Sequence, residues 1–416
     1  MPEFLRVLTL EQAKTKFEEN WRPRPHVVTL PLDGVLGRVL AEDVVSKIDV
    51  PPFDRAAYDG FAVSASDTFG AGEGSPVRLV LAGRLMAGAW PKKRLLKGEC
   101  TEISTGAPMP EGSDSVVMSE DTVAKGEKVE VYRAVAPGEN VAKRGSDIRR
   151  GQRVLHAGES LTHVKLGVLA AIGIGRVRVF SKPKVAIVSS GAELVRPGGR
   201  LSPGKVYDIN GPALSGAVSS CGAEPVYLGI ARDRAPDIRK LVRKGLSSCD
   251  VVLISGGSSA GAGDIIPRVV NGMGRPGVIV HGLALKPGKP TFIAVLNEKP
   301  VFGLPGYPVS ALMVFDQLVA DYLCELSGEP RPQRPTVQAK LTTRVLSARG
   351  RRELVPVRLV KKNRESLAEP ILKGSGAVTS ISTAEGYIEV PLERELVEEG
   401  EVVKVRLFGG ERRDQG

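Results

Sequence analysis

Apolar and polar residues alternate along this chain with two different periods, and each period predicts a different kind of segment. Residues 9–20, "TLEQAKTKFEEN", place Phe17 at helical spacing behind a Thr9–Gln12 capping pattern, and they predict a helix. Residues 31–44, "PLDGVLGRVLAEDV", predict a second helix. Segments such as "VRLVLAGRL", separated by Gly and Pro turns, then predict short antiparallel strands up to about residue 140.

A helical segment, "LTHVKLGVLAAIG", and a strand, "RVRVF", follow before apolar strands begin to alternate with helices. The strands are predicted in "KVAIVSS", "AEPVYLGIARD", "DVVLISGG" and "TFIAVLNEKPVFGLPG", and the helices in "NGPALSGAVSSCG", "RAPDIRKLVRKGLSSC", "DIIPRVVNGM" and "PVSALMVFDQLVADYLCEL". This alternation predicts a doubly wound parallel α/β sheet, with a ligand site beyond the carboxyl ends of its strands. After the linker-like "SGEPRPQRP", alternating segments predict a small C-terminal β domain.

The composition narrows the class of protein. A chain of 416 residues, 42% hydrophobic and 25% charged, suits a soluble globular protein of several domains. It contains no apolar run of membrane-spanning length and no signal-peptide core, so we expect a cytoplasmic protein without membrane contacts. The four scattered cysteines form no CxxC pair, which argues against structural zinc. The net charge of +11 is spread along the chain and aromatic residues make up only 5%, which argues against nucleic-acid binding.

Candidate chemistry gathers in loops that follow the predicted α/β strands. "VVLISGGSSAGAGD" places Ser255, Gly256, Gly257 and Ser258 after a buried strand and Asp264 at the end of the loop. Backbone N–H groups in such a loop form an anion nest, although a tight strand-to-helix turn also needs glycines. Asp264 suits both a helix cap and a Mg²⁺ ligand beside a phosphate, and the two roles are compatible.

A second loop, "LKPGKP", holds Lys286 and Lys289 three residues apart, with a proline after each. Two like charges on so rigid a segment favour a phosphate or another tetrahedral oxyanion between them, rather than two solvated lysines. "GLPGYPVSA" adds Pro305 and Ser310 at the start of a helix, as a further anion site or simply as a helix start. Glu193 in "SSGAELV" follows the first strand of the sheet and is either functional or a surface carboxylate.

Three more polar residues lie in loops of the N-terminal part. Asp59 lies in "PPFDRAAYDGFAV", Thr105 in "STGAPMPEGSD" and Asp147 in "AKRGSDIRRGQ". Each loop alone is an ordinary turn, because Asp and Gly favour turns for backbone reasons. The repeated occurrence of polar, glycine-rich loops is nevertheless unusual.

Seven segments occur in the order found in one enzyme family: "FDRAAYDGFAV", "STGAPMPEGSDSVVMSED", "GENVAKRGSDIRRGQ", "SSGAELV", "SGGSSAGAGD", "LKPGKP" and "GLPGYPVSA". From about residue 5 to 410 the chain resembles the molybdopterin molybdenumtransferases, the MoeA and gephyrin E-domain family. Seven ordered motifs are much more specific than any one of them.

The resemblance implies a multidomain α/β plus β fold, with an elongated subunit that forms a homodimer. Its implied parts are a discontinuous helical or mixed domain (1–48 plus 141–180), an inserted β domain (49–140), a doubly wound, molybdopterin-binding-like α/β domain (181–328) and a C-terminal β domain (329–416).

The resemblance also implies a reaction. The enzyme would bind adenylylated molybdopterin, Mg²⁺ and molybdate or tungstate, insert the metal into the dithiolene, cleave the pyrophosphate link and release AMP. The upstream adenylyltransferase is an implied partner.

Site residues carry over position by position. Lys286, Lys289, Ser310 and Arg351 match oxyanion-binding positions. Ser258 and Asp264 match the loop that binds the ligand and the cation. Positions tied to activity are matched by Asp59, Thr105, Asp147 and Glu193. The resemblance also implies Asp264 and Glu193 as Mg²⁺ ligands, and it includes Ser375 in "GSGAVTS". Two features depart from the family: Tyr307 stands where Asn is usual, and the Gly/Ser loop is longer.

Three other functions compete with this interpretation. The α/β part alone also resembles the adenylyltransferases that make adenylylated molybdopterin, but those proteins lack the flanking β domains. A non-catalytic, molybdopterin-binding scaffold would be favoured by a long linker or a fused partner domain. A nucleic-acid binder would need a basic, aromatic cluster or a recognition helix. The sequence contains neither a long linker nor a fused partner domain, and it contains neither a basic, aromatic cluster nor a recognition helix.

Overall fold

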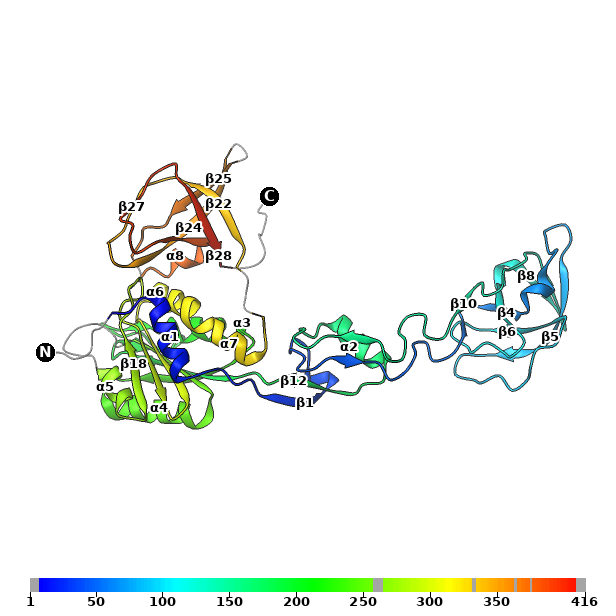
Figure 1. Cartoon of the computed structure of the whole chain (residues 1–416), viewed down its shortest axis with the longest axis horizontal. Coiled ribbons are helices and arrows are strands. Elements are labelled where there is room, and N and C mark those ends of the chain that lie inside the picture. Colours follow the sequence, from blue (N-terminus) through cyan, green and yellow to red (C-terminus); the bar gives the residue numbers. More distant parts are fainter. Residues whose placement is uncertain (1–6, 257–264, 331–333, 363–364, 375, 409–416) are drawn as a thin grey trace. The chain divides into compact units, whose positions relative to one another are not determined.

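The computed structural model describes residues 7–256, 265–330, 334–362, 365–374 and 376–408 (Figure 1). Its internal contacts divide the chain into two compact units. Unit 1 comprises Met1–Thr29, Gly37–Ala41 and Arg178–Gly416, and unit 2 comprises Leu30–Leu36 and Glu42–Val177. The boundary between them falls within the paired strands β1 (Val27–Pro31) and β12 (Arg176–Phe180). The four predicted domains divide the chain differently, since the predicted domain 1–48 plus 141–180 has residues in both units, and their boundaries stay predictions.

A six-stranded sheet forms the centre of unit 1. Its order is β16 (Glu224–Ala231), β13 (Lys184–Ser190), β17 (Val251–Ser255), β21 (Lys299–Leu304), β20 (Phe292–Leu296) and β18 (Pro276–His281). The pairs β16–β13, β13–β17 and β17–β21 are parallel, whereas β20 runs antiparallel to both of its neighbours. The carboxyl ends of all strands except β20 therefore meet at one edge, together with the amino end of β20.

Helices cover both faces of this sheet because its strands are apolar on both sides. Val185 and Ile187 of β13 face one core, and Ala186 and Val188 face the other. The first core is covered by α1 (Leu10–Asn20), α3 (Asn210–Ser220), α6 (Pro308–Val314) and α7 (Ala320–Ser327), and the second by α4 (Ala235–Ser248) and α5 (Ile265–Asn271). In the part of the chain that is described, no helix combines the length and the apolar character needed to cross a bilayer.

Helix α1 packs on this sheet rather than with residues 141–180, with which the sequence analysis grouped it. Its Phe17 ring is fully buried and lies 4.9 Å from the ring of Tyr322 on α7 and 5.2 Å from that of Phe302 on β21, centroid to centroid. Thr9 and Gln12 close the predicted capping box. Aromatic contacts of this kind stabilise beyond the area that they bury, and they hold the start of the chain on unit 1.

A π-helical turn, η4 (Phe315–Val319), joins α6 to α7. It carries Asp316, which forms an ion pair with Arg334, and burial raises the pKa of this carboxyl group. Gln317 donates to the hydroxyl oxygen of buried Tyr387 at 2.6 Å. The turn therefore connects the long helix to the C-terminal strands.

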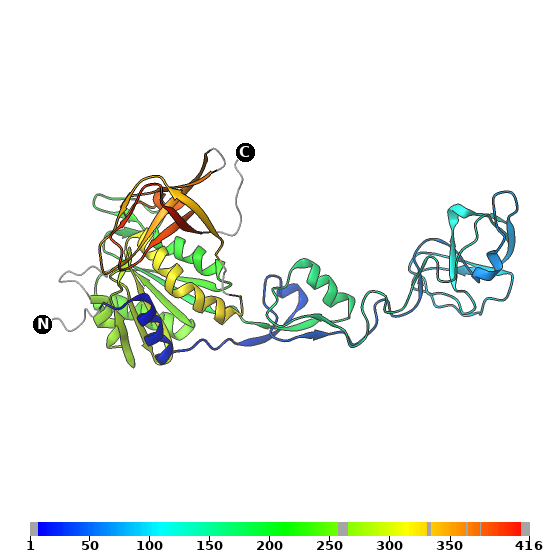
Figure 2. The ribbon, with the colours of Figure 1, turned by 45° about the horizontal axis from the view of Figure 1, so that its top comes forward.

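The C-terminal strands form a second six-stranded sheet that closes on itself (Figure 2). Its order is β19 (Leu285–Lys286), β24 (Arg352–Lys362), β25 (Glu365–Pro370), β22 (Thr336–Leu341), β28 (Val402–Leu407) and β26 (Gly386–Val390), with β26 also paired to β24. Leu354 and Tyr387 of this sheet belong to the same hydrophobic core as the helices of the α/β sheet. The two sheets of unit 1 thus share one core.

Unit 2 contains a third six-stranded sheet and a short helix, α2 (His163–Ala171). The sheet order is β7 (Ser115–Met118), β4 (Gly60–Val63), β6 (Glu99–Ile103), β5 (Val77–Leu85), β9 (Lys128–Val131) and β8 (Thr122–Lys125). Its core is made of small and β-branched residues such as Val63, Val117 and Val131, all fully buried.

Three sequence-based expectations for these elements are wrong. Residues 31–44 form no α-helix: they contain the 3₁₀ turn η1 (Leu32–Gly34) and lead into β2 (Val44–Val45), and Gly37 with a φ of +70° takes the left-handed conformation that ends a helix. Strand β5 pairs with β6 in parallel, which the long connection between them permits. Strand β20 is antiparallel because Asn297 and Glu298, with φ of 50° and 66°, form a two-residue hairpin turn to β21.

A buried carboxylate makes the stability of unit 2 depend on pH. Glu130 on β9 accepts hydrogen bonds from Lys125 at 2.7 Å and from the Tyr132 hydroxyl at 3.0 Å, and forms an ion pair with Arg78 at 3.0 Å. These partners, Lys125 first, lower the pKa of Glu130 from 4.5 to about 2. A lowered folded-state pKa stabilises the fold above the unfolded-state value, and this contribution is lost as the pH falls toward the folded-state value.

We expect Glu130→Gln to lower the Tm of unit 2 at pH 7 and to flatten its decline between about pH 4.5 and pH 2. Thermal unfolding of the full chain followed across this pH range measures both effects. Glu127→Gln, an exposed change in the same hairpin, is the matched control and should reproduce the wild-type profile. Equal acid sensitivity of Glu130→Gln and wild type would contradict the assignment.

Candidate functional site

The carboxyl edge of the α/β sheet forms the floor of a large pocket in unit 1. The cavity measures about 1090 Å³, and loops that follow β13, β17, β18 and β21 line it together with residues of the C-terminal sheet. Of the residues predicted from sequence, the structure brings eight to this pocket: Glu193, Ser255, Gly256, Lys286, Lys289, Pro305, Ser310 and Arg351. A pocket therefore lies beyond the carboxyl ends of the strands, where the sequence predicts a ligand site, and its binding of a ligand stays a prediction.

Gly256 is required where three strands converge. Its φ is +107°, and a Cβ atom at this position would lie 2.0 Å from the carbonyl oxygen of Ser190 on β13. Its N–H group donates to the carbonyl of Leu304, at the end of β21, at 3.2 Å. The close approach of these backbones means that no other residue fits here without moving a strand.

The lysine loop is held in place on both sides. Gly288, with a φ of +136°, passes so close to α6 that a Cβ atom would lie 2.6 Å from the side chain of Val314. Thr291 donates its hydroxyl to the Gly288 carbonyl at 2.7 Å. Strand β19, which contains Lys286, pairs in parallel with β24 of the C-terminal sheet. The backbone beneath both lysines is thus anchored to two layers of unit 1.

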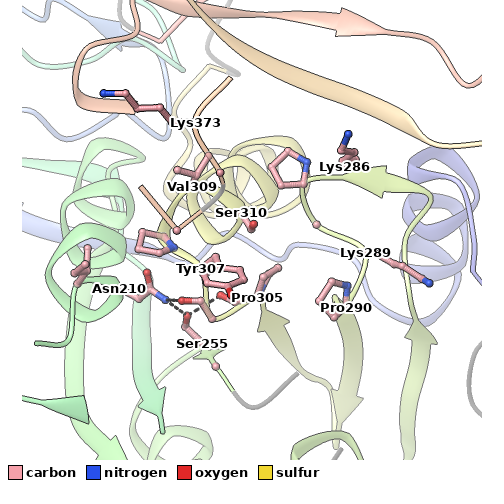
Figure 3. A pocket seen from close by; sticks show the side chains of 18 of the residues that line it. Asn210, Ser255, Lys286, Lys289, Pro290, Pro305, Tyr307, Val309, Ser310 and Lys373 are labelled. Atoms are coloured by element: carbon pink, nitrogen blue, oxygen red, sulfur yellow. Dashed lines mark hydrogen bonds between the residues drawn. The ribbon is translucent and has the colours of Figure 1, made fainter. Parts of the chain in front are cut away.

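The two lysines have different environments. Lys286 forms an ion pair with Glu353 at 2.9 Å, and the Glu353 side chain is only 12% exposed. Among the described residues, Lys289 and Arg351 have no ion-pair partner. Figure 3 shows the two ammonium groups pointing away from each other. The loop therefore offers one neutralised cation and one cation without a partner in the described part of the chain, rather than a symmetric pair.

Ser310 lies in the first turn of α6, and its side chain is directed toward the pocket in Figure 3. The residue is 4% exposed, so its hydroxyl can serve a ligand inside the pocket but not one on the surface. Tyr307, just before the helix, is 64% exposed and lines the same space. Its phenol ring occupies room that a smaller residue would leave open.

An amide network crosses the floor of the pocket (Figure 3). Asn210, at the start of α3, donates through Nδ2 to the Ser255 hydroxyl at 2.6 Å and to the Gly306 carbonyl at 2.8 Å. Ser255 in turn donates to the Pro305 carbonyl at 3.1 Å. Two of the predicted residues, Ser255 and Pro305, are thus linked to one that the sequence analysis did not select.

Carboxylates lie on the β13 side of the pocket. Glu193 and Asp233 both line it, and Asp233 accepts from the Ser190 hydroxyl at 2.9 Å. In the described part of the chain, no three His, Cys, Asp or Glu side chains gather to hold a metal ion. Mg²⁺ commonly takes only one or two protein carboxylates and completes its shell with water and substrate phosphates. Glu193 and Asp233 are the carboxylates that this side of the pocket offers for that mode.

A further carboxylate, Asp208, has a structural role beside the pocket. It accepts from the Ser189 hydroxyl at 2.7 Å, the Tyr227 hydroxyl at 2.6 Å and the Gly211 N–H at 3.0 Å. Burial, followed by the bond to Asp208, raises the pKa of Tyr227 to about 12. These contacts fix the start of α3, and therefore Asn210, against β13.

Three predicted residues belong to unit 2. Asp59 accepts from the backbone N–H of Thr105 at 2.7 Å and from its hydroxyl at 3.0 Å, and the backbone bond is the first cause that lowers the pKa of Asp59. The sequence analysis named both residues without predicting that they touch. Asp147 is exposed. Their functional roles stay predictions, as do those of the pocket residues.

Four predicted residues, Gly257, Ser258, Asp264 and Ser375, lie outside the described residues. Conversely, the sequence analysis missed Asn210, Asp233 and Glu353 as pocket residues. A signal for Asp233 existed, since it ends the predicted strand "AEPVYLGIARD" and should reach the same edge. Glu353 had no local signal, because a strand pairing between distant segments brings it to Lys286.

Comparison with known proteins gives consistent matches along the chain. Residues 8–173 match the MoeA N-terminal region (domains I and II), residues 186–325 a probable molybdopterin binding domain, and residues 338–408 the MoeA C-terminal region (domain IV). A protein of Methanocaldococcus jannaschii named for molybdopterin biosynthesis is 35% identical over 411 residues, 96% of each chain. Molybdopterin molybdenumtransferase 2 of Mycobacterium tuberculosis is 34% identical over 330 residues, 78% of this chain and 82% of the relative.

The fold has a solved counterpart as well. The crystal structure of a molybdopterin biosynthesis MoeA protein from Pyrococcus horikoshii is 44% identical, with a TM-score of 0.82, and the match covers 97% of this chain and all of that one. Similarity therefore extends over both units, not over the α/β part alone.

The ion pair at Lys286 predicts in which direction the loss of Glu353 changes the affinity of the pocket for anions. We expect Glu353→Gln to raise the affinity of the pocket for sulfate or molybdate about three- to tenfold at low ionic strength, because Lys286 loses its neutralising partner. Isothermal titration calorimetry measures the change. Glu389→Gln removes an ion-pair partner of Arg352 and Arg406 outside the pocket and should leave the affinity unchanged. A weaker affinity of Glu353→Gln would mean instead that the ion pair positions Lys286.

Proposed function

Because this chain belongs to the MoeA family of molybdopterin molybdenumtransferases, we propose that it inserts molybdenum into molybdopterin, using adenylylated molybdopterin and molybdate or tungstate and releasing AMP. The observation that carries the proposal is one pocket that gathers Lys286, Lys289 and Arg351 from two separate layers of unit 1. A cavity of about 1090 Å³ is far larger than a tetrahedral oxyanion requires and suits a large organic anion beside it.

The chemical task is to bring two anions together. The organic substrate already carries the two sulfur ligands, so the protein needs no nucleophile of its own. As the two thiolates bind the metal, two oxide ligands of the oxyanion take up protons and leave as water. Cleavage of the pyrophosphate link consumes one oxygen nucleophile, from water or from the oxyanion, and AMP is the leaving group. Orientation and charge neutralisation supply most of the rate enhancement in such a reaction.

The described residues support these tasks in different ways. Lys289 and Arg351 offer positive charge that no described carboxylate neutralises, and Lys286 can exchange Glu353 for an incoming anion. Ser310 provides a hydroxyl donor inside the pocket. Because Lys286 is paired with β24 and Arg351 directly precedes that strand, we expect their spacing to change little when a ligand enters.

We also propose that Mg²⁺ takes part. Glu193 and Asp233 would hold it, and when bound it would neutralise charge on the pyrophosphate. The family further leads us to propose a cytoplasmic homodimer that receives its organic substrate from an adenylyltransferase. Light scattering of the purified chain tests the dimer, since each subunit has a mass of 44.2 kDa.

The proposal predicts oxyanion-dependent release of AMP. Purified protein, adenylylated molybdopterin and Mg²⁺ are incubated with molybdate, with tungstate or without an oxyanion, and AMP is quantified by chromatography. We expect release only with an oxyanion, and the faster one identifies the preferred metal. Tight binding of the organic substrate without AMP release under any condition would point to a binding or scaffold role instead.

Removal of the unpaired lysine should slow this reaction. We expect Lys289→Ala to reduce kcat/KM for the oxyanion about 10- to 100-fold, because a pre-positioned charge is lost from the pocket. Lys240→Ala, an exposed change on α4 away from the pocket, is the matched control and should retain full activity. Equal activities of the two variants would remove Lys289 from the proposed site.

A further inference from the structure

Two buried oxygens at the pocket lack hydrogen-bond partners. Among the described residues, Asn210 Oδ1 and Glu353 Oε2 are buried, unpaired and carried by residues that line this pocket. Buried acceptors are almost always paired, and leaving one unpaired is destabilising. Asn210 is only 8% exposed, so bulk water does not replace the missing partner. No described residue donates to its oxygen, which leaves this acceptor open to a ligand that seats against the floor of the pocket.

The orientation of the Asn210 amide follows from its neighbours. Its Nδ2 group lies 2.8 Å from the Gly306 carbonyl oxygen, which can only accept a hydrogen bond. The reversed amide would place two acceptor oxygens against each other at this position. The Ser255 hydroxyl already donates to the Pro305 carbonyl and therefore accepts from Nδ2. Oδ1 is thus the atom left over, and Figure 3 shows it turned away from Ser255.

An acceptor of this kind selects for the chemistry of its partner. A fully ionised oxyanion or pyrophosphate has no proton to donate, so neither satisfies Oδ1. N–H and O–H groups do. The organic substrate proposed above carries N–H groups on two heterocycles, the pterin and the adenine, and O–H groups on its ribose. The ribose is joined directly to the phosphate groups, whereas the heterocycles lie at the ends of the molecule, so an acceptor far from the cationic part of the pocket favours a heterocycle.

The sheet separates these two parts. Ser255, the partner of Asn210, ends β17, whereas the lysine loop follows β18, three strands away in the order β17, β21, β20 and β18. At about 4.8 Å between neighbouring strands, this separation is roughly 14 Å. A substrate with a heterocycle at one end and phosphate groups further along can reach both parts at once.

We infer that Asn210 Oδ1 accepts a hydrogen bond from an N–H group on a heterocycle of the substrate, which makes the floor of the pocket beside β17 a heterocycle-recognition subsite. The inference rests on the proposed function for the identity of the substrate. Asn210 discriminates between ligands by the presence of a donor and takes no part in bond making or breaking.

Two pairs of small probes test this inference without the full substrate. The first pair is 6-hydroxymethylpterin and its analogue that is methylated at N3 and dimethylated at the 2-amino group. The second pair is AMP and N6,N6-dimethyl-AMP. In each pair only the first member keeps the N–H donors, and affinity is measured by calorimetry for wild type and Asn210→Ala. Comparing the two probes of a pair in both wild type and Asn210→Ala isolates the free energy of the contact between the N–H donor and Asn210.

For one of the two pairs, we expect wild type to bind the unmethylated probe about tenfold more tightly than the methylated one. Asn210→Ala should bind both members of that pair equally, and the pair that responds identifies the heterocycle. Asn271→Ala, which removes an amide at the end of α5 outside the pocket, should keep the wild-type ratio. If Asn210→Ala does not fold, Asn210→Ser allows the same comparison.

A purely structural role of Asn210 would weaken the binding of all four probes by the same factor and leave both ratios unchanged, which would overturn the inference. An absence of any preference in wild type would overturn it equally. AMP release by the wild type is measured separately. Selective binding without AMP release would support the subsite and refute the proposed reaction. AMP release, with affinity ratios that Asn210→Ala leaves unchanged, would support the reaction and refute the subsite.

Discussion

The pairing of β19 with β24 is the contact on which the pocket depends. The pocket has walls from two sheets, and side-chain ion pairs alone would hold such walls weakly, because exposed ion pairs contribute little free energy. Here the backbone joins them: Leu285 and Lys286 pair in register with Arg352 and Glu353, and the Arg352 N–H donates to the Ala284 carbonyl at 2.9 Å. Backbone groups must be paired when buried, so this junction resists separation. The position of Arg351 relative to the lysine loop follows from it.

The same junction explains how charge is distributed in the pocket. It places a carboxylate, Glu353, beside Lys286 and leaves Lys289 without a partner among the described residues. A site with three unpaired cations would attract every abundant anion, whereas partial neutralisation makes binding depend on contacts that reach further into the cavity. Unpaired acceptors at Asn210 and Glu353 add a demand for donors that inorganic anions cannot meet. In the proposed function, the cations of the pocket attract the ligand, and the acceptors of Asn210 and Glu353 select it by hydrogen bonding.

Much of this architecture could be predicted from the sequence, since local patterns determine it. The apolar runs that become β13 and β17 end in serine, the run that becomes β21 is followed by Pro305 and Gly306, and parallel strands bring such ends to one edge. That argument placed Ser255, Pro305 and Lys286 correctly. It failed where contacts between distant segments decide. Glu353 reaches the pocket only through the pairing with β19, and α1 packs on the α/β sheet because Phe17 fits between Phe302 and Tyr322.

The π-helical turn η4 changes the direction in which side chains project from the long helix that contains it. Successive residues of an α-helix are rotated by about 100°, and a π-turn accommodates one additional residue without breaking the helix. Before the turn, Ser310 faces the pocket, and after it Tyr322 faces Phe17 of α1. The π-turn therefore sets the rotation of α7 relative to α6, so that the side chains at both ends of the long helix face their partners. Deletion of a single residue within it would restore a regular helix, yet would rotate one end out of alignment with its partners. Length variation in this helix is thus constrained at the level of single residues.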